Sequence, residues 1–528
     1  NFYRIIGYDI NIAGNDINVI PPEIEEADRP VFTSLRQHKI AGEHQLNPIT
    51  LDWDIALSSI KRMEKDISTA LLVPKKIDDD YHYFYGASIN ASEPRVRPMS
   101  RQSYENAEQH YSWSLNATLP FSFNKQKNSL KMGYFGQRKK GDFSWIQASL
   151  FANSINNPGI LYLPVHELSN PENMGVDGLQ YRIGSMNSDQ FEGKNKLDAF
   201  YAMMDNRLTE KLRLVWGIRA EKFNYTELKT PPRSLIIPVQ TDSIPDKEWT
   251  WLPSANLTYN LTSAINVRAA WSKSVIRPEL MDNNEFLIYS PYLGGDLSNF
   301  DLKNSAVNAL DFKAEWYPGL GEIVSIGAYY KHFDKPIELT YSSVGGAVLF
   351  LQKNSDFAKV YGLEFEFRKR LGFISETWLN DLSLFGNVTL QKSTVQASYE
   401  TMETNEDGSM EFVTKAVKSS RPMYGNAPYI LNAGLQYDAQ RLNFNITFNK
   451  TGYKTYIIAD IPQQMEYEMP RSVLDMQVGY RFLKERLLVK VNAANLLNTR
   501  TAFYKNTDSY TENLTNKDEE AVFKDGFS

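Results

Sequence analysis

The chain contains 528 residues, carries a net charge of −6 and has no cysteine. The lack of cysteine excludes disulfide frameworks, thiol nucleophiles and cysteine-based metal sites, and the mild negative charge argues against a general nucleic-acid binder. The mean hydropathy is −0.43, and no apolar run reaches the roughly 18 residues that a membrane helix needs.

Short segments of alternating apolar and polar residues recur along the whole chain and come in pairs. In 442–449, for example, Leu442, Phe444, Ile446 and Phe448 alternate with polar residues. Successive side chains of a strand point to opposite faces, so each segment has one apolar face and one polar face. The connections between these segments alternate between short turns and long loops. Aromatic residues make up 13% of the chain. This pattern predicts an all-β protein, a transmembrane antiparallel β-barrel with a polar interior and interfacial aromatic girdles.

About sixteen segments fit this pattern, most of them near the ~10 residues that a tilted membrane strand requires. Turns such as 209–211, 262–264, 438–441 and 484–486 are short and polar, as periplasmic turns are. In chain order the predicted strands are 36–47, 49–60, 110–123, 130–151, 191–208, 212–227, 249–261, 265–277, 306–317, 323–339, 357–371, 382–397, 428–437, 442–458, 472–483 and 487–504.

We expect a single barrel domain over 1–528 that is truncated at both ends. Residues 2–12 read as part of a strand, and 521–528 as the beginning of another. An open barrel leaves unpaired backbone groups in the hydrocarbon, so the natural protein is expected to contain more strands. No signal peptide opens the chain, so Asn1 is not expected to be the natural start. Long extracellular loops are predicted near 61–109, 151–190, 228–248, 278–304, 398–426 and 505–520.

Several phrases of the sequence resemble TonB-dependent outer-membrane receptors. They are Trp251-Leu-Pro-Ser-Ala-Asn-Leu-Thr-Tyr259, Ile265 through Pro278, Tyr317-Pro-Gly, Lys335-Pro-Ile-Glu338, Asn354 through Tyr361-Gly-Leu-Glu364, and Asn492-Ala-Ala-Asn-Leu-Leu-Asn498. No single phrase is specific, and the resemblance rests on their order and spacing over residues 36–504.

The resemblance implies a barrel of about 22 strands, of which roughly 16–18 are represented here. It also implies an N-terminal plug and nutrient uptake driven through a TonB-type energising complex. Neither a plug nor a TonB box is present in this sequence. The sequence also resembles SusC-like receptors, which pair with a SusD-like surface lipoprotein. No residue of this sequence requires that partner. The expected nutrient is a siderophore, a glycan, a peptide or a similar cargo, and the expected location is the outer membrane.

The segment Asp78-Asp-Asp-Tyr-His-Tyr-Phe-Tyr85 is the candidate ligand site in a loop. An aromatic cluster beside three carboxylates is suited to gripping a sugar, a siderophore or Ca²⁺, and a self-packed loop is the alternative. The candidate ligand-binding residues here are Asp78, Asp79, Asp80, Tyr81, Tyr83 and Tyr85. Asn405-Glu-Asp-Gly408 has oxygens compatible with Ca²⁺ but lacks EF-hand spacing, and we interpret it as a turn.

A second candidate set consists of charged residues on the predicted interior face. They either line a transport path or pair with one another and with a plug, and we favour pairing. The set is Arg213, Arg219, Glu221, Glu364, Glu366 and Arg368. We assign Trp216, Trp271, Trp316 and Tyr480 to the lipid-facing girdles rather than to a ligand platform.

No enzyme motif was found: there is no HExxH, GxSxG, Walker or dinucleotide signature, and no cofactor is expected. The predicted function is therefore that of an outer-membrane receptor and transporter. The alternatives are a passive porin and a receptor-like barrel that serves as a scaffold in an envelope complex. A soluble adhesin of packed sheets is a third alternative, and it requires the apolar faces to be buried by a second sheet.

Overall fold

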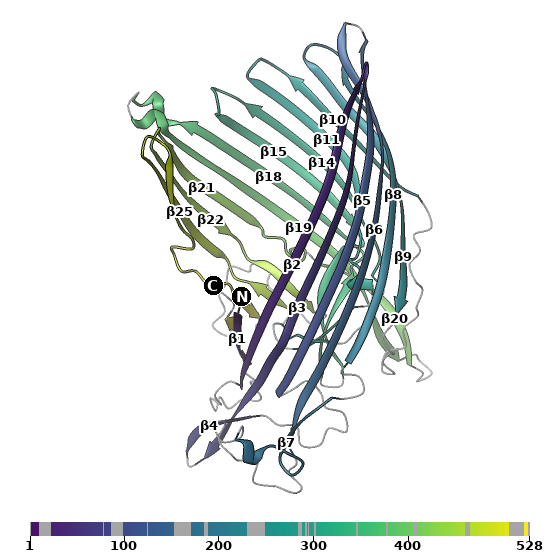
Figure 1. Cartoon of the computed structure of the whole chain (residues 1–528), viewed down its shortest axis with the longest axis vertical. Coiled ribbons are helices and arrows are strands. Elements are labelled where there is room, and N and C mark those ends of the chain that lie inside the picture. Colours follow the sequence, from purple (N-terminus) through teal and green to yellow (C-terminus); the bar gives the residue numbers. More distant parts are fainter. Residues whose placement is uncertain are drawn as a thin grey trace.

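Sixteen long strands form one continuous antiparallel sheet in which each strand pairs with the next. Figure 1 shows this sheet as a tall curved wall, and we call these sixteen strands the wall. The computed structural model describes residues 2–9, 23–77, 79–85, 99–123, 125–152, 170–183, 188–229, 249–283, 288–290, 293, 295–299, 302–344, 347–375, 378–404, 410–419, 421–459, 465–505 and 522–525. The wall consists of β2 Glu23–Leu46, β3 Ile49–Ile77, β5 Met99–Phe123, β6 Gln126–Ala152, β8 Ser188–Arg207, β9 Leu212–Lys229, β10 Thr250–Asn260, β11 Ile265–Ile276, β14 Ser305–Trp316, β15 Ile323–Asp334, β18 Phe357–Arg370, β19 Leu382–Thr404, β21 Tyr429–Asp438, β22 Leu442–Thr451, β25 Arg471–Phe482 and β26 Leu487–Ala493.

The number and order of these strands confirm the prediction from alternation. Four shorter strands extend the sheet beyond the wall: β1 pairs with β2, β4 with β3, β7 with β6 and β20 with β19. Their bounds are β1 Phe2–Asp9, β4 Asp80–Tyr85, β7 Leu179–Arg182 and β20 Met410–Ser419. All four lie toward the lower end in Figure 1, away from the short turns that join the wall strands.

The predicted loop bounds are wrong wherever strands continue past the apolar segment. Strand β3 runs on to Ile77 and β5 starts at Met99, so much of 61–109 is paired backbone. In the same way β8 begins inside 151–190, and β19 and β20 occupy most of 398–426. Beyond the bilayer both faces of a strand meet a polar environment, so the alternation fades while backbone pairing goes on. Within the predicted loop 278–304, residues 288–290 pair with 295–297. Residues 230–248 and 506–520 of the remaining two predicted loops lie outside the described residues.

Three predicted strands are split because the chain turns out of the wall. After β15 ends at Asp334, Lys335 adopts a positive φ of 52° and β16 begins at Ile337. Gly452 lies between β22 and β23, and β26 ends at Ala493, well before β27. A positive φ is rare for a residue with a side chain, and it changes the direction of the strand. The alternation of apolar and polar residues continues through such a turn, so it does not predict where the strand is interrupted.

The strands that leave the wall form a second sheet with the order β12-β13-β17-β16-β23-β24-β27-β28. The pairs β13–β17 and β16–β23 are parallel and the others antiparallel. Phe350, Ile457 and Leu293 are buried together in this sheet, as are Tyr467 and Met465. The bounds are β12 Ile288–Ser290, β13 Gly295–Asn299, β16 Ile337–Val344, β17 Ala347–Asn354, β23 Lys454–Ala459, β24 Glu466–Glu468, β27 Ala502–Lys505 and β28 Val522–Asp525.

The described helical elements are single 3₁₀ turns, η2 Pro171–Asn173, η3 Met281–Asn283, η4 Leu371–Phe373 and η5 Trp378–Asp381. Over the described part of the chain no helix has the length and apolar character needed to cross a membrane.

The apolar side chains of the wall lie on its outward face and are exposed. Leu310, Ile326, Leu363 and Leu390 are each more than half exposed, and strand register places them on one face. Trp216, Trp271, Trp316 and Tyr480 lie on the same face. A water-soluble protein does not leave so large an apolar band uncovered, whereas a lipid-facing barrel surface consists of one. The apolar faces therefore do not meet across a protein seam in the described residues.

Candidate functional site

The opposite face of the wall, here called the interior face, is polar and internally hydrogen-bonded. Asn116 on β5 donates to Asp52 on β3 at 2.6 Å, and the Tyr201 hydroxyl on β8 donates to Asn116 at 2.6 Å. Ser114 donates to Asp54 at 2.5 Å. Because these bonds join neighbouring strands, they fix the side chains as well as the backbone register. The interior face is thus a pre-ordered polar surface.

Three of the predicted interior charges take part in ion pairs on β8, β9 and the end of β11. The Arg213 guanidinium donates to both Asp205 oxygens, at 2.8 and 2.6 Å. Glu221 accepts from Arg219 at 2.6 Å and from Arg277 at 2.7 Å. Bidentate and charge-assisted bonds of this kind are among the stronger polar contacts in proteins.

The other three predicted charges lie on β18. Glu366 accepts from Lys313 at 3.2 Å, and Arg368 donates to the Gln436 amide oxygen at 2.7 Å. Glu364 has no ion pair among the described residues, and Thr389 is its cross-strand neighbour. The six charges therefore share the interior face but form separate small networks along it, rather than one cluster.

The segment 277–283 after β11 is tethered to this face toward the end of the wall that carries the long connections. Lys139 on β6 contacts Glu108 on β5 at 3.0 Å and also pairs with Glu279. Leu280 is almost fully buried and lies over Gly141. A Cβ atom at position 141 would be 3.0 Å from Leu280 Cδ1, so the close packing there favours a glycine. Met281 packs against the buried cluster of Phe143, Trp145 and Phe191. We call Glu108, Lys139 and Glu279 the wall tether.

The wall tether is expected to weaken in acid. Burial opposes ionisation of Glu108, but hydrogen bonds from His110 and Lys139 outweigh it and lower the pKa of Glu108 to about 2. A carboxylate with a depressed pKa adds stability above its unfolded pKa, near 4.5, and that stability is lost as the pH falls toward 2. The contribution at neutral pH is on the order of 3 kcal/mol.

The measurement is hydrogen exchange of 277–283 between pH 5 and pH 2.5, corrected for intrinsic exchange rates. Wild type should lose protection over this range, and Glu108→Gln should show a smaller pH dependence, because the Glu279 and Asp282 carboxylates remain. Glu105→Gln is the matched control, because Glu105 forms an exposed pair with Lys61 on the other face of β5. Equal profiles for Glu108→Gln and wild type would contradict the assignment.

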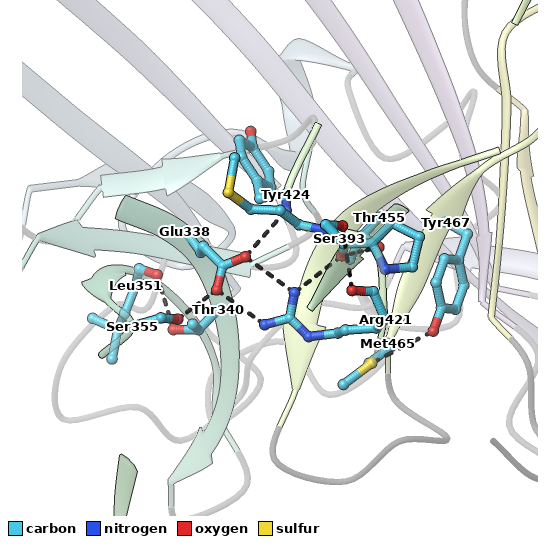
Figure 2. A network of polar contacts seen from close by, with 12 residues as sticks. Glu338, Thr340, Leu351, Ser355, Ser393, Arg421, Tyr424, Thr455, Met465 and Tyr467 are labelled. Carbon is cyan, nitrogen blue, oxygen red and sulfur yellow. Dashed lines mark hydrogen bonds and ion pairs between the residues drawn. The ribbon is translucent and has the colours of Figure 1, made fainter. Parts of the chain in front are cut away.

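A buried ion pair, here called the rim clamp, holds the second sheet to the wall (Figure 2). Arg421 donates through Nη1 to Glu338 Oε1 at 3.0 Å and through Nη2 to Oε2 at 2.9 Å. The exposed fractions of the two side chains are 3% and 0%. Ser355 donates to the same carboxylate, and so does the Tyr424 backbone N–H at 3.1 Å. Burial alone raises the pKa of Glu338, but Arg421 and these hydrogen bonds lower it overall.

The rim clamp lies on the interior side of the wall. The Met423 backbone N–H donates to the Ser393 hydroxyl at 2.6 Å, and the Gln391 amide donates to the Ala427 carbonyl at 2.6 Å. Ser393 and Gln391 belong to the polar face of β19. On the other side of the clamp, Thr455 of β23 donates to the Pro422 carbonyl at 2.9 Å. The second sheet is thus attached to the interior face at the end of the wall that carries the long connections.

The predicted loop cluster is a β-hairpin at the end of β3. Residues 80–85 form β4, which pairs with 72–77, and Asp79 turns the chain with a φ of 70° and contacts Lys76 at 2.9 Å. Alternation places Tyr81 and Asp80 on opposite faces of β4, and the side chains of Tyr83 and Tyr85 lie outside the described ones. Asp78 and 405–408 lie outside the described residues. Among the described residues, those of this hairpin included, no group of three or more His, Asp and Glu side chains is placed to hold a metal ion.

Sequence reasoning missed the rim clamp and the wall tether. Glu338 was included in a predicted membrane strand, and Arg421 in a predicted loop. One signal was available, because a lone glutamate between Ile337 and Leu339 in an apolar context needs a buried partner. Nothing in the sequence identifies that partner as Arg421, which lies 83 positions away.

Comparison with known proteins gives one family and a set of structures. The sequence model described as "TonB dependent receptor-like, beta-barrel" matches residues 25–496. None of the curated proteins matches the chain. Among solved structures, the FpvAI–pyocin S2 complex is similar over 93% of this chain and 66% of that one, with 12% identity and a TM-score of 0.50.

Two further structures are similar at lower scores. Pseudomonas aeruginosa FpvA bound to heterologous pyoverdines has 12% identity and a TM-score of 0.49, and it is covered to 64% by 92% of this chain. The ferric enterobactin receptor PfeA of Pseudomonas aeruginosa has 15% identity and a TM-score of 0.46, with 67% of it covered by 92% of this chain. The chain thus spans about two thirds of the length of these structures.

Proposed function

Because this chain belongs to the TonB-dependent receptor-like β-barrel family, we propose that the protein is a receptor that takes up a scarce nutrient by energised gating. Its place is the outer membrane, where barrels of this family are found. The proposed cargo is a siderophore, a glycan, a peptide or a similar nutrient. The proposed energising partner is a TonB-type complex, and a SusD-like surface lipoprotein stays a prediction.

The observation that carries the proposal is a polar, pre-ordered interior face with a second sheet fixed across it. A rigid wall with loops folded over its outer mouth allows specificity to be built into the loops. The wall tether and the rim clamp hold two such segments in place without using the apolar face. This arrangement supports selective binding followed by gating. A passive porin requires an open aqueous path, and the inward-folded sheet does not favour it.

One side chain of the interior face, Arg277, keeps two donors without a partner among the described residues. Arg277 binds Glu221 through Nη1 and lies over the Phe223 ring at 5.0 Å. Its buried Nε and Nη2 atoms have no hydrogen-bond partner in the described residues. Unpaired buried donors are costly, so these two atoms are a strained feature of the interior face. No step of covalent chemistry is proposed.

The test is deletion of the natural full-length gene, followed by growth on single sources of iron, glycan or peptide. We expect loss of growth on one nutrient class, rescue by the full-length gene, and uptake that stops when an uncoupler collapses the proton gradient. Uptake of many small solutes that is insensitive to the uncoupler would identify a porin. Normal growth on every source, together with loss of an envelope complex, would identify a scaffold.

A further inference from the structure

The outward apolar band ends in a basic residue on four strands of one panel of the wall. On β18 the band consists of Tyr361, Leu363, Phe365 and Phe367, and Lys359 is the next outward residue. In the same way Lys273 follows Trp271 on β11, His332 follows Tyr330 on β15, and Lys392 follows Leu390 on β19. All four lie toward the long connections, which is the outer side of the membrane.

Strand register brings these residues together. Lys273 is opposite Asn308, Asn308 opposite His332, and His332 opposite Lys359. Lys392 is opposite Tyr361, one outward position from Lys359. Directly opposed residues on one face have Cβ atoms about 4.5–5.5 Å apart. Lys273, Asn308, His332, Lys359 and Lys392 therefore form a continuous patch, here called the basic strip.

The positive charge of the basic strip is not neutralised by the protein. No carboxylate among the described residues pairs with Lys273, Lys359 or Lys392; Lys359 instead lies over the Phe357 ring at 5.4 Å. Asp334 is the one acidic residue that alternation places on this face within the described side chains of β11–β19. It lies one outward position beyond His332 and forms no ion pair with the strip.

The opposite panel of the wall shows a different arrangement of outward charges. There Arg138 and Lys196 share Asp198, at 3.0 and 3.3 Å, and Lys140 pairs with Glu192 at 2.6 Å. Lys194 and Lys222 on the same panel form no ion pair among the described residues, but Lys222 is directly opposite Asp198, and Lys194 is directly opposite Lys140, which pairs with Glu192. In the basic strip, no carboxylate of the described residues lies between the basic side chains.

We propose that the basic strip binds the phosphate groups of a phosphorylated lipid in the outer leaflet. Phosphate oxygens accept charge-assisted hydrogen bonds from ammonium groups, and the strip lies at headgroup depth because it borders the apolar and aromatic band. Isolated lysines extend their ammonium groups into water at such positions. A contiguous set beside Tyr330 and Tyr361 instead presents several donors to one anionic headgroup. The inference depends on the lipid-facing orientation, and not on the proposed transport.

The test uses the full-length protein in phosphatidylcholine vesicles with and without diphosphoryl lipid A. The variant is Lys273→Gln/Lys359→Gln/Lys392→Gln, and the matched control is Lys140→Gln/Lys196→Gln on the opposite panel. We expect the amount of lipid A retained per protein to fall about tenfold in the triple variant and to stay near wild type in the control. The Lys→Arg triple should restore binding.

Two further arms separate the sources of binding. Dephosphorylated lipid A should be retained no better by wild type than by the triple variant, and inorganic phosphate alone should bind neither. Heat-modified migration on a gel checks that each variant is folded. Equal retention by the folded triple variant and wild type would overturn the proposal. Equal retention of the dephosphorylated lipid would also overturn it, because acyl chains or sugars would then be the recognised groups.

Discussion

Replacing Leu363 by arginine is expected to destabilise the barrel by about 2–4 kcal/mol. Leu363 is 56% exposed and lies near the centre of the outward band of β18, which is bounded by Lys359 and Lys369. A guanidinium there lies in the hydrocarbon, too far from either interface to reach water easily. The measurement is the equilibrium free energy of unfolding by guanidinium chloride in lipid vesicles.

The matched control is Thr389→Arg on the neighbouring strand β19. Thr389 is opposite Glu364 on the interior face, so the new guanidinium meets water and a carboxylate. We expect a change within about 1 kcal/mol. If both arginines cost the same, or if Leu363→Arg has no effect, the assignment of the apolar face to lipid is wrong.

Replacing Arg421 by methionine is expected to release the second sheet from the interior face. Removing one partner of a buried ion pair leaves the other charge uncompensated and costs about 3–5 kcal/mol. Here the remaining group is the Glu338 carboxylate, which is fully buried. The change should be local, because the wall strands keep their own backbone pairing. Hydrogen exchange over β16 and 421–428 should accelerate, with little change in β5 or β6.

Two variants show whether the charge itself is responsible. Lys454→Met breaks the partly exposed pair with Glu468, at 3.1 Å, and should cost about 1 kcal/mol or less. The double variant Glu338→Leu/Arg421→Met removes both charges and should recover most of the lost protection, because apolar replacements of buried pairs are often tolerated. Unchanged exchange in Arg421→Met would show that the rim clamp does not hold the second sheet.

The wall could be predicted because lipid imposes one simple rule on the sequence. In β22 and β18 every second side chain must be apolar, and the others face a polar interior, so a period of two is written into the residues. The same rule correctly placed six charged residues on the interior face: Arg213, Arg219, Glu221, Glu364, Glu366 and Arg368. It stops at the membrane surface, and the extensions of β3 and β5 were therefore missed.

The partners of the interior charges were beyond sequence reasoning. Arg277 pairs with Glu221 across 56 positions, and Lys139 pairs with Glu279 across 140. Alternation predicts on which face of its own strand a residue lies. It does not predict which residues of distant segments lie next to each other along the barrel axis. The turns at Lys335 and Gly452 add to this, because they carry strand-forming residues out of the wall and into another sheet.

The sequence by itself determined a sixteen-stranded antiparallel wall, its lipid-facing side and its polar side, since these follow from local periodicity. Only the tertiary structure decided where strands leave the wall, which segments cover the interior, and that Glu338 and Arg421 join there. Those features depend on contacts between residues far apart in the chain. The free energy that stabilises these features comes from burial and charge pairing between distant segments, so it cannot be inferred from the residues of a single strand.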